Sequence, residues 1–430
     1  MSKPVMRWSG AALAAALLLG VPAAWAQDPA PPEHQHDMSQ MDMSTPGAWH
    51  RMQDGSLSLL FNRQGGERGG NEFKAPNWWM GMASRKAVGG DLTLTGMLSL
   101  DPATVGTEGY REIFQVGEAL DGRPLVDRQH PHDFFMQLSA AWRTTVRGTG
   151  LTLAGGLSGE PALGPVAFMH RASAAGIPFA PLGHHTFDST HIAFGVATVG
   201  VDRGRVAVEA SAFNGREPDQ RRWDMDFGRM DSVSGRLWFR PSANWDLQVS
   251  SGRLVDPEQL HAGNVIRTTA SASYLAGTDA NRLALSVGAG MNATDEVTRH
   301  ALFGEVSRWW GRTLGSLRAE VVEVESELLI HGELPGAGAH GAAEKATLGA
   351  LTLGAVRDVA SWKGLTASFG ANATLYGVPV ALRATHGVHP ASAQLFIQLR
   401  PRAGGHAHVE HAHGRAAPGR GVRTPALSAT

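Results

Sequence analysis

Residues 188–217 read DSTHIAFGVATVGVDRGRVAVEASAFNGRE and contain two alternating stretches joined by a tight polar turn. In the second stretch Val206 and Val208 point to one face and Glu209 to the other, which is the period-two pattern of a β-strand. The residues Asp-Arg-Gly at 202–204 suit a tight connection between two strands. The segment therefore predicts a β-hairpin with an apolar and a polar face, whose far ends run into stretches rich in His, Pro, Gly and charge.

The composition favours a large β-rich protein. The chain has 430 residues, 53 of them glycine and only 18% charged, and no long apolar helical stretch follows its first residues. A formal net charge of -1 without a basic patch argues against nucleic acid as a partner. Because the chain contains no cysteine, disulfides, thiolate metal sites and cysteine nucleophiles are excluded.

Residues 1–26 are predicted to be a secretory signal peptide. Lys3 and Arg7 precede or flank an apolar stretch, and Ala-Trp-Ala at 24–26 forms a cleavage site of small residues. A transmembrane helix is the alternative, but the apolar stretch is shorter than the roughly 20 residues that a span needs. No later segment is a candidate transmembrane helix, so a mature chain in a membrane would have to be a closed barrel.

The rest of the chain predicts sixteen strands between residues 55 and 401. They lie near 56–63, 77–86, 90–101, 132–146, 149–160, 188–201, 204–217, 232–241, 245–255, 266–277, 281–292, 300–311, 314–328, 346–359, 364–377 and 391–400. Every second connection is short, as at 147–148, whereas the intervening ones are mostly long, as at 102–131 and 161–187.

Short turns at one end and long loops at the other are typical of an outer-membrane barrel. The predicted fold class is therefore all-β: a closed antiparallel transmembrane β-barrel of about 16 strands (14–18), with short periplasmic turns and long extracellular loops. A soluble β-sandwich or propeller is the alternative, but neither has a reason to segregate its long loops to one end. An even strand count returns the chain to the side where it began, so both termini are expected in the periplasm of a Gram-negative cell.

Residue parity assigns the two faces of the barrel. Leu285 and Val287 are expected to face lipid, and Ser286 the lumen. Tryptophans near strand ends are expected to form interfacial girdles: Trp78, Trp79, Trp142, Trp238, Trp245, Trp309, Trp310 and Trp362. Charged residues on the polar face would either line a water-filled lumen or neutralise one another in a plugged one: Arg143, Glu209, Arg236, Arg240, Glu305, Arg318 and Glu320.

Two terminal segments are rich in potential metal ligands. Residues 27–54 are predicted to be a disordered periplasmic segment, because they combine proline with closely spaced His and Met. Its candidate ligands are His34, His36, Met38, Met41 and Met43. Thioethers favour Cu(I), although a polar linker is the alternative. Residues 402–430 form a second predicted disordered segment, either metal-binding or a low-complexity extension, whose candidate ligands are His406, His408, His411 and His413.

The histidines of the barrel region all lie on the predicted long-loop side. Barrel closure would bring these loops together at the extracellular mouth, where imidazoles distant in sequence could meet carboxylates. The candidate metal or gating site consists of His130, His132, Asp133, His184, His185, Asp188 and His191. Nitrogen and oxygen donors would suit Zn(II) or Cu(II) rather than Cu(I). The alternatives are a hydrogen-bonded latch and polar loops without any site, and the spacing matches no His-Glu-x-x-His signature.

The order of signal peptide, His/Met-rich segment and barrel resembles the copper-resistance outer-membrane proteins of the CopB/PcoB type. The residues that carry this resemblance are Asp37-Met38-Ser39 and Met41-Asp42-Met43-Ser44. The resemblance implies that the segment takes up periplasmic copper and that the barrel anchors it in the outer membrane.

The sequence thus favours an outer-membrane channel or metal-handling barrel, with copper or zinc ions and no organic cofactor. Its expected partners are outer-membrane lipid, metal ions or small solutes, and a periplasmic metal-handling protein. A structural or adhesive barrel with a plugged lumen is the second hypothesis. An enzyme such as a lipase is disfavoured, because Ser189 and His191 share the lumenal face of one strand, away from lipid.

Overall fold

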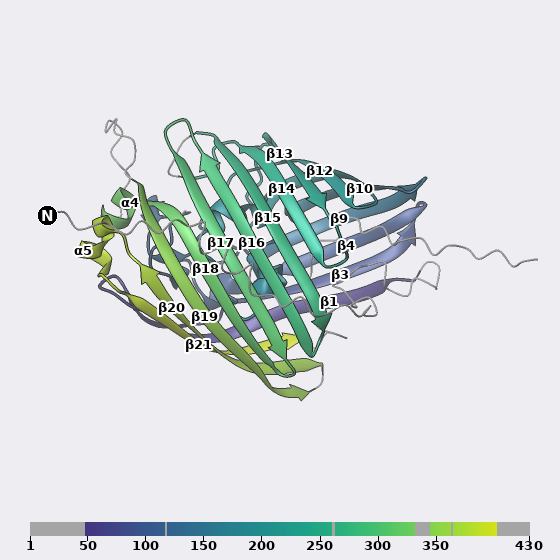
Figure 1. Ribbon diagram of the computed structural model, residues 1–430. Helices are drawn as coiled ribbons and strands as arrows, with labels where there is room; N and C mark the ends of the chain where they lie inside the picture. The colour runs from purple at the N-terminus through teal and green to yellow at the C-terminus, as the bar shows by residue number, and fades with distance from the viewer. Residues whose placement is uncertain (1–47, 117, 260–262, 332–344, 363, 402–430) are drawn as a thin grey trace, which may run out of the picture. The chain divides into compact units, whose positions relative to one another are not determined.

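The computed structural model describes residues 48–116, 118–259, 263–331, 345–362 and 364–401. In this part of the chain, sixteen antiparallel strands form one closed barrel (Figure 1). They are β1 (His50–Gln64), β3 (Asn77–Ala87), β4 (Gly90–Leu98), β9 (Phe135–Val146), β10 (Thr149–Gly159), β11 (Ala193–Arg203), β12 (Val206–Phe213), β13 (Ser232–Phe239), β14 (Trp245–Leu254), β15 (Val265–Thr278), β16 (Asn281–Ala293), β17 (Thr298–Trp310), β18 (Thr313–Glu325), β19 (Lys345–Trp362), β20 (Leu365–Gly377) and β21 (Ala391–Pro401). The barrel closes where β1 pairs with both β3 and β21.

Shorter elements occupy the long connections. The short strands are β2 (Gly70–Lys74), which pairs with β1, and β5 (Tyr110–Arg111), β6 (Glu118–Leu120), β7 (Arg123–Leu125) and β8 (Arg128–Gln129). The helical turns are α2 (Asp101–Thr104), η2 (Phe168–His170), η3 (Ala172–Ala174), α3 (His184–Phe187), η4 (Ser189–His191), α4 (Ser326–His331), η5 (Val380–Leu382) and α5 (Arg383–His386). Within the described residues, no helix has the length and apolar character needed to cross a membrane.

The structure confirms the predicted fold class and the number of barrel strands. The first strand begins at His50 rather than at Gly55, because residues 50–54 pair with Met80–Ser84 of β3. His50 lies opposite Ser84 and Pro401 lies opposite Leu365, so the barrel begins and ends at the short-turn end. The predicted signal peptide, the segment up to residue 47 and the tail from residue 402 lie outside the described residues.

The two faces of the barrel follow the predicted parity. In β12, Val206 and Val208 are exposed on the outer surface. Glu209 of the same strand points to the lumen and is only 3% exposed. In β16, Val287 is 53% exposed and Ser286 only 3%. Apolar outer positions around a ring of strands present the surface that a lipid bilayer requires.

The girdle prediction is right for four tryptophans and wrong for Trp238 and Trp309. The outer surface exposes Trp79, Trp245, Trp310 and Trp362. Trp238 and Trp309 are instead buried on the lumenal side, where Trp238 Nε1 donates to Glu209 Oε2 over 3.0 Å and the Arg282 guanidinium lies 4.3 Å from the Trp309 ring centre. The reason is parity, since proximity to a turn does not determine which face a side chain takes.

The loop of residues 160–192, between β10 and β11, folds into the lumen and reaches the opposite wall. Arg171 of this loop donates two hydrogen bonds to the Glu305 carboxylate of β17, at 2.7 and 3.0 Å. Arg318 of β18 donates to the same carboxylate at 3.0 Å and to the Phe179 carbonyl of the loop at 2.9 Å. Because β10 is the fifth barrel strand and β18 the thirteenth, the loop spans half the circumference.

A second long connection, residues 99–134 between β4 and β9, also packs inside the barrel. Its Phe114 is buried against Tyr376 of β20 and stacks on His386, with ring centres 4.5 Å apart. Its Asp127 accepts contacts from His386 at 3.0 Å and from Arg68 at 2.7 Å. The lumenal charges named here therefore pair with one another and with the inserted loops.

The Glu305 carboxylate should hold the inserted loop in place. Replacing Glu305 by Ala would remove the carboxylate that two buried guanidinium groups share and leave Arg171 with only its 3.5 Å carboxylate contact to Asp188, at a cost of about 3–5 kcal/mol. We expect protease cleavage within residues 160–192 to accelerate at least tenfold and single-channel conductance in planar bilayers to rise. Asp202→Asn is the matched control, because Asp202 pairs with Arg143 of the wall at 2.8 Å and not with the loop. Equal effects of the two substitutions would contradict the role of Glu305 in holding the loop of residues 160–192.

Candidate metal centre

Two inserted loops bring five histidines together near the long-loop end of the barrel. His130 and His132 come from the loop before β9, and the other three from the loop before β11. The distances between ring centres are 5.9 Å for His130–His184, 5.6 Å for His130–His185, 5.8 Å for His132–His191, 5.3 Å for His184–His185 and 5.3 Å for His184–His191. The sequence predicted this convergence from the neighbouring positions of the two hairpins. The cluster is enclosed rather than open at a mouth, since the loops cover it and His184 is only 1% exposed.

In all five histidines an oxygen lies within 3.2 Å of Nδ1, and in three of them the contact is shorter than 3.0 Å. His184 Nδ1 lies 2.7 Å from the Asp188 carboxylate, His132 Nδ1 lies 2.9 Å from the Asp101 carboxylate, and His191 Nδ1 lies 2.7 Å from the Asp188 carbonyl. An oxygen acceptor fixes the proton on Nδ1 and leaves the Nε2 lone pair for a ligand. Metal-binding histidines have this arrangement, in which an outer oxygen orients the ring. We refer to His132, His184 and His191 as the histidine triad.

Asp188 is the residue that orders the triad. One carboxylate oxygen contacts His184, and the other accepts the Phe168 amide at 2.8 Å and lies 3.5 Å from Arg171. The hydrogen bond and charge of His184 together with the Arg171 charge outweigh burial and lower the pKa of Asp188 to about 2. Asp188 is therefore a fixed anion at the base of the cluster.

Burial keeps several of the imidazoles neutral. It lowers the pKa of His191 to about 3, and the neighbouring His184 and His132 act in the same direction. Burial also lowers the pKa of His184 and His130. His185 differs, because its hydrogen bond with Glu217 and the charges of Glu217 and Glu118 outweigh burial and raise its pKa. Neutral imidazoles are the form that binds metal ions.

The remaining members of the predicted site have other partners. His130 Nε2 lies 3.2 Å from Glu118, and His185 Nδ1 lies 3.2 Å from Glu217. Asp133 accepts a hydrogen bond from the Arg222 guanidinium at 3.1 Å. Asp133 therefore neutralises an arginine beside the cluster and does not contact an imidazole of the triad.

Two of the three pairs in the triad, His132–His191 and His184–His191, have separations that suit an ion with nitrogen donors. With Zn–N bonds of about 2.0–2.1 Å, two tetrahedral imidazole ligands have ring centres about 5 Å apart. The observed separations of 5.3 and 5.8 Å are close to this value. Within the described chain, however, no three ligand atoms of the histidines lie within 4.8 Å of one another, so ring rotation must complete the coordination. His191 Nε2 is buried and has no hydrogen-bond partner among these residues.

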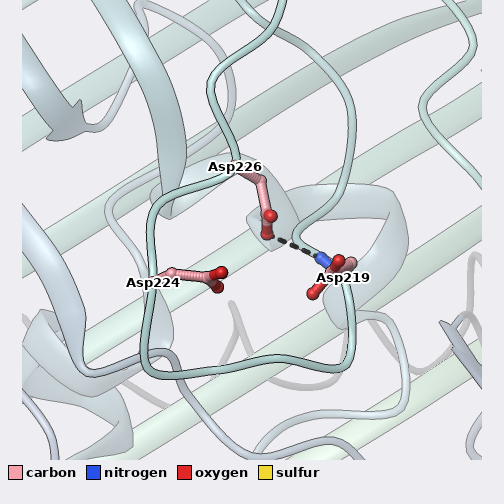
Figure 2. A group of neighbouring side chains, drawn as sticks. All are labelled: Asp219, Asp224 and Asp226. Carbon is pink, nitrogen blue, oxygen red and sulfur yellow. Dashed lines mark hydrogen bonds between the residues drawn. The ribbon is translucent and has the colours of Figure 1, made fainter.

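One group of three aspartates does meet the 4.8 Å limit. The carboxylates of Asp219, Asp224 and Asp226 lie within 4.8 Å of one another in the loop between β12 and β13 (Figure 2). Arg221 contacts Asp219 at 3.0 Å and Asp224 at 3.9 Å, and the Asp219 amide donates to Asp226 at 2.8 Å. An arginine and an amide thus account for this group, and we assign no metal to it.

Sequence reasoning missed the residues that support the histidines. Asp101, Glu118 and Glu217 lie 32 or fewer residues from their partners in sequence, but the contacts depend on the path of the inserted loops. Arg222 lies 89 residues from Asp133, and no local pattern marks it. The predicted terminal ligands, from His34 to Met43 and from His406 to His413, lie outside the described residues.

The fold defines the class of protein: a sixteen-strand barrel of the kind found in the outer membrane. No known protein family matches the sequence, and no curated protein is similar to it. The structure is similar to that of OprB from Pseudomonas putida, with a TM-score of 0.51 and 9% sequence identity over 82% of this chain and 94% of OprB. An anion-selective porin of Comamonas acidovorans gives a TM-score of 0.47 and 10% identity over 82% of this chain and 99% of the porin. At these identities the likeness concerns the fold alone.

The buried His191 predicts a pH dependence of the metal-free protein. Its imidazole binds a proton near its ordinary pKa of about 6.5 when the chain unfolds but only near 3 when it is folded. Stability is therefore lost as the pH falls below 6.5. Between pH 7.5 and 5.0 the free energy of unfolding should fall by about 2 kcal/mol more for the wild type than for His191→Gln. Denaturant titrations at both pH values test this, and parallel pH profiles would contradict it.

Proposed function

We propose that the protein is an outer-membrane channel of restricted conductance that binds Zn(II) or Cu(II) in its lumen at the histidine triad. The observation that supports this most strongly is the oxygen that holds Nδ1 of each triad histidine. The Nε2 atom of His191 is also buried without a hydrogen-bond partner among the described residues, whereas His130 Nε2 lies against Glu118. The porin-like fold and the apolar outer surface support the location in an outer membrane.

The donor set favours borderline divalent ions. Imidazole suits zinc and copper, and the nearby Asp188 and Asp101 carboxylates balance part of the positive charge of a divalent ion. The depressed pKa values of His184 and His191 mean that these two ligands need not release protons at neutral pH. Copper remains the leading ion from the resemblance in the N-terminal segment, and the nitrogen donors of the triad also suit Zn(II).

A pocket beside His185 offers a route to the cluster. It lies between the inserted loop of residues 99–134 and β17 and β18, and four carboxylates line it: Glu118, Glu258, Glu323 and Glu325. Each carboxylate has a basic partner, since Arg222 contacts Glu118, Arg299 contacts Glu258 and Glu325, and Lys345 contacts Glu323. The position of the pocket, rather than its charge, supports this route.

The terminal segments fit the same proposal as accessory ligands. Both ends of the described barrel lie at the short-turn end, which faces the periplasm in outer-membrane barrels. The ligands from His34 to Met43 and from His406 to His413 would then bind metal on the periplasmic side and exchange it with a periplasmic metal-handling partner. The Met and His ligands of the first segment suit Cu(I).

A plugged structural barrel is the second candidate function. It is favoured by the two inserted loops, whose Arg171 contacts the opposite wall and whose Phe114 contacts Tyr376 of β20. This candidate predicts no conductance and no metal effect on it. An enzymatic role is not proposed: Ser189 accepts a hydrogen bond from Arg267 at 2.9 Å, and His191 Nδ1 is engaged by the Asp188 carbonyl.

Zinc binding by the refolded full-length protein tests the proposal. The background is a terminal-ligand variant, in which the predicted histidines of both terminal segments are Asn and Met38, Met41 and Met43 are Leu. Isothermal titration should detect one Zn(II) per barrel, and replacing His132, His184 and His191 by Ala should weaken it at least 100-fold. Co(II) should give the visible absorption of a tetrahedral site in the background variant and lose it in the triple variant.

His300→Ala is the matched control. His300 lies on the outer side of β17 beside Glu323, remote from the triad, so its loss should leave zinc binding unchanged. Conductance of the background variant should fall when Zn(II) is added. Equal zinc affinity with and without the triad, together with no measurable conductance, would favour the structural barrel.

A further inference from the structure

Seven methionines gather on one side of the lumen. Met80, Met82, Met97 and Met136 are buried together in one cluster, and Met52, Met169 and Met225 pack against it. We refer to these seven residues as the methionine cluster. They are seven of the nine methionines in the described part of the chain, and Met230 and Met291 are the other two.

Strand register places the thioethers of the wall in pairs. Met52 of β1 lies directly opposite Met82 of β3, and Met80 of β3 lies directly opposite Met97 of β4. Side chains directly opposite in an antiparallel sheet have Cβ atoms about 4.5–5.5 Å apart. These positions face the lumen, because the adjacent Trp79 is 46% exposed on the outer surface while Met80 is 1% exposed.

Three separate parts of the chain contribute to the cluster. The wall supplies five methionines, the inserted loop of residues 160–192 supplies Met169, and the loop between β12 and β13 supplies Met225. Ile192, which follows His191 of the triad, packs in the same cluster. The methionine cluster therefore adjoins the histidine triad.

The composition of this patch differs from the rest of the lumenal wall. On β14 and β15 the inward positions are polar, as in Gln248, Ser250 and Thr269, which hydrogen-bond to one another. Apolar packing alone would be served by leucine, which this chain uses widely on its outer face. Methionine differs from leucine in its polarisable thioether, which fills irregular gaps and binds soft metal ions.

We infer that the methionine cluster is a binding site for a soft monovalent metal ion, Cu(I) or Ag(I). It is separate from the nitrogen site of the triad, because thioethers select monovalent copper and silver whereas imidazoles suit divalent zinc and copper. The lumen would then contain two adjacent sites, one with thioether ligands for a soft monovalent ion and one with imidazole ligands for a divalent ion. This inference does not depend on metal binding by the triad.

Silver titration of full-length protein tests the inference with Ag(I) as the probe. The background is again the terminal-ligand variant, which lacks the three N-terminal methionines. Replacing Met80, Met82, Met97 and Met136 by Leu conserves side-chain volume and should cost little stability. We expect the loss of at least one bound Ag(I) or a 100-fold weaker affinity, with Zn(II) binding unchanged.

The matched control replaces Met230 and Met291, which lie outside the cluster, by Leu and should leave Ag(I) binding unchanged. An X-ray absorption spectrum at the silver edge, recorded on the background variant, does not depend on folding of the quadruple variant. Sulfur neighbours around silver support the inference. Unchanged Ag(I) stoichiometry and affinity in the quadruple variant, or only nitrogen and oxygen neighbours, would overturn it and leave the cluster as apolar packing.

Discussion

The interior of this barrel depends on the contacts that Asp188 makes. One carboxylate oxygen accepts a hydrogen bond from the Phe168 amide and lies against Arg171, which in turn reaches Glu305 on the opposite wall. The other carboxylate oxygen orients His184, and the Asp188 backbone carbonyl orients His191. The ion pairs that hold the loop in the lumen and the hydrogen bonds that orient the triad therefore meet at one residue.

The placement of charge follows from the closed barrel. Charged side chains buried in the lumen, such as Glu305 and Arg318, must be paired, because an isolated buried charge costs several kcal/mol. The inserted loop of residues 160–192 supplies one partner, Arg171 for Glu305, and Arg222 of the loop between β12 and β13 pairs with Asp133 of the other inserted loop. The imidazoles between these pairs stay neutral because burial lowers the pKa of His130, His184 and His191. Because the charged groups pair with one another and the imidazoles stay neutral, the enclosed space contains uncharged nitrogen donors.

The sequence predicted the fold well because its signals are local. Alternation in stretches such as residues 281–292, and tight turns such as 147–148, determine strands and their order without knowledge of distant contacts. Convergence of the histidines also followed, since the two loops belong to neighbouring hairpins. The girdle prediction was wrong for Trp238 and Trp309 because it used their positions near strand ends. It did not use the face of the strand to which their side chains point.

The supporting residues could not be predicted because they depend on the path of inserted loops. Asp101 meets His132 only because both ends of the loop of residues 99–134 return to the same place. The methionine cluster was missed for a similar reason: Met52 and Met225 are 173 residues apart in sequence, and only barrel closure and the inserted loops bring them to one side. Long-range register, rather than local pattern, determines both sites.

The central claim is that the histidine triad binds a divalent ion through Nε2 atoms that outer oxygens have oriented. Anomalous diffraction at the zinc edge, from crystals of the full-length protein grown with Zn(II), tests it most directly. The account predicts an anomalous peak about 2.0–2.1 Å from Nε2 of His132, His184 and His191, with Asp101 and Asp188 still holding the Nδ1 atoms. A peak only at the chain termini or on the surface, with the three imidazoles unchanged, would contradict it.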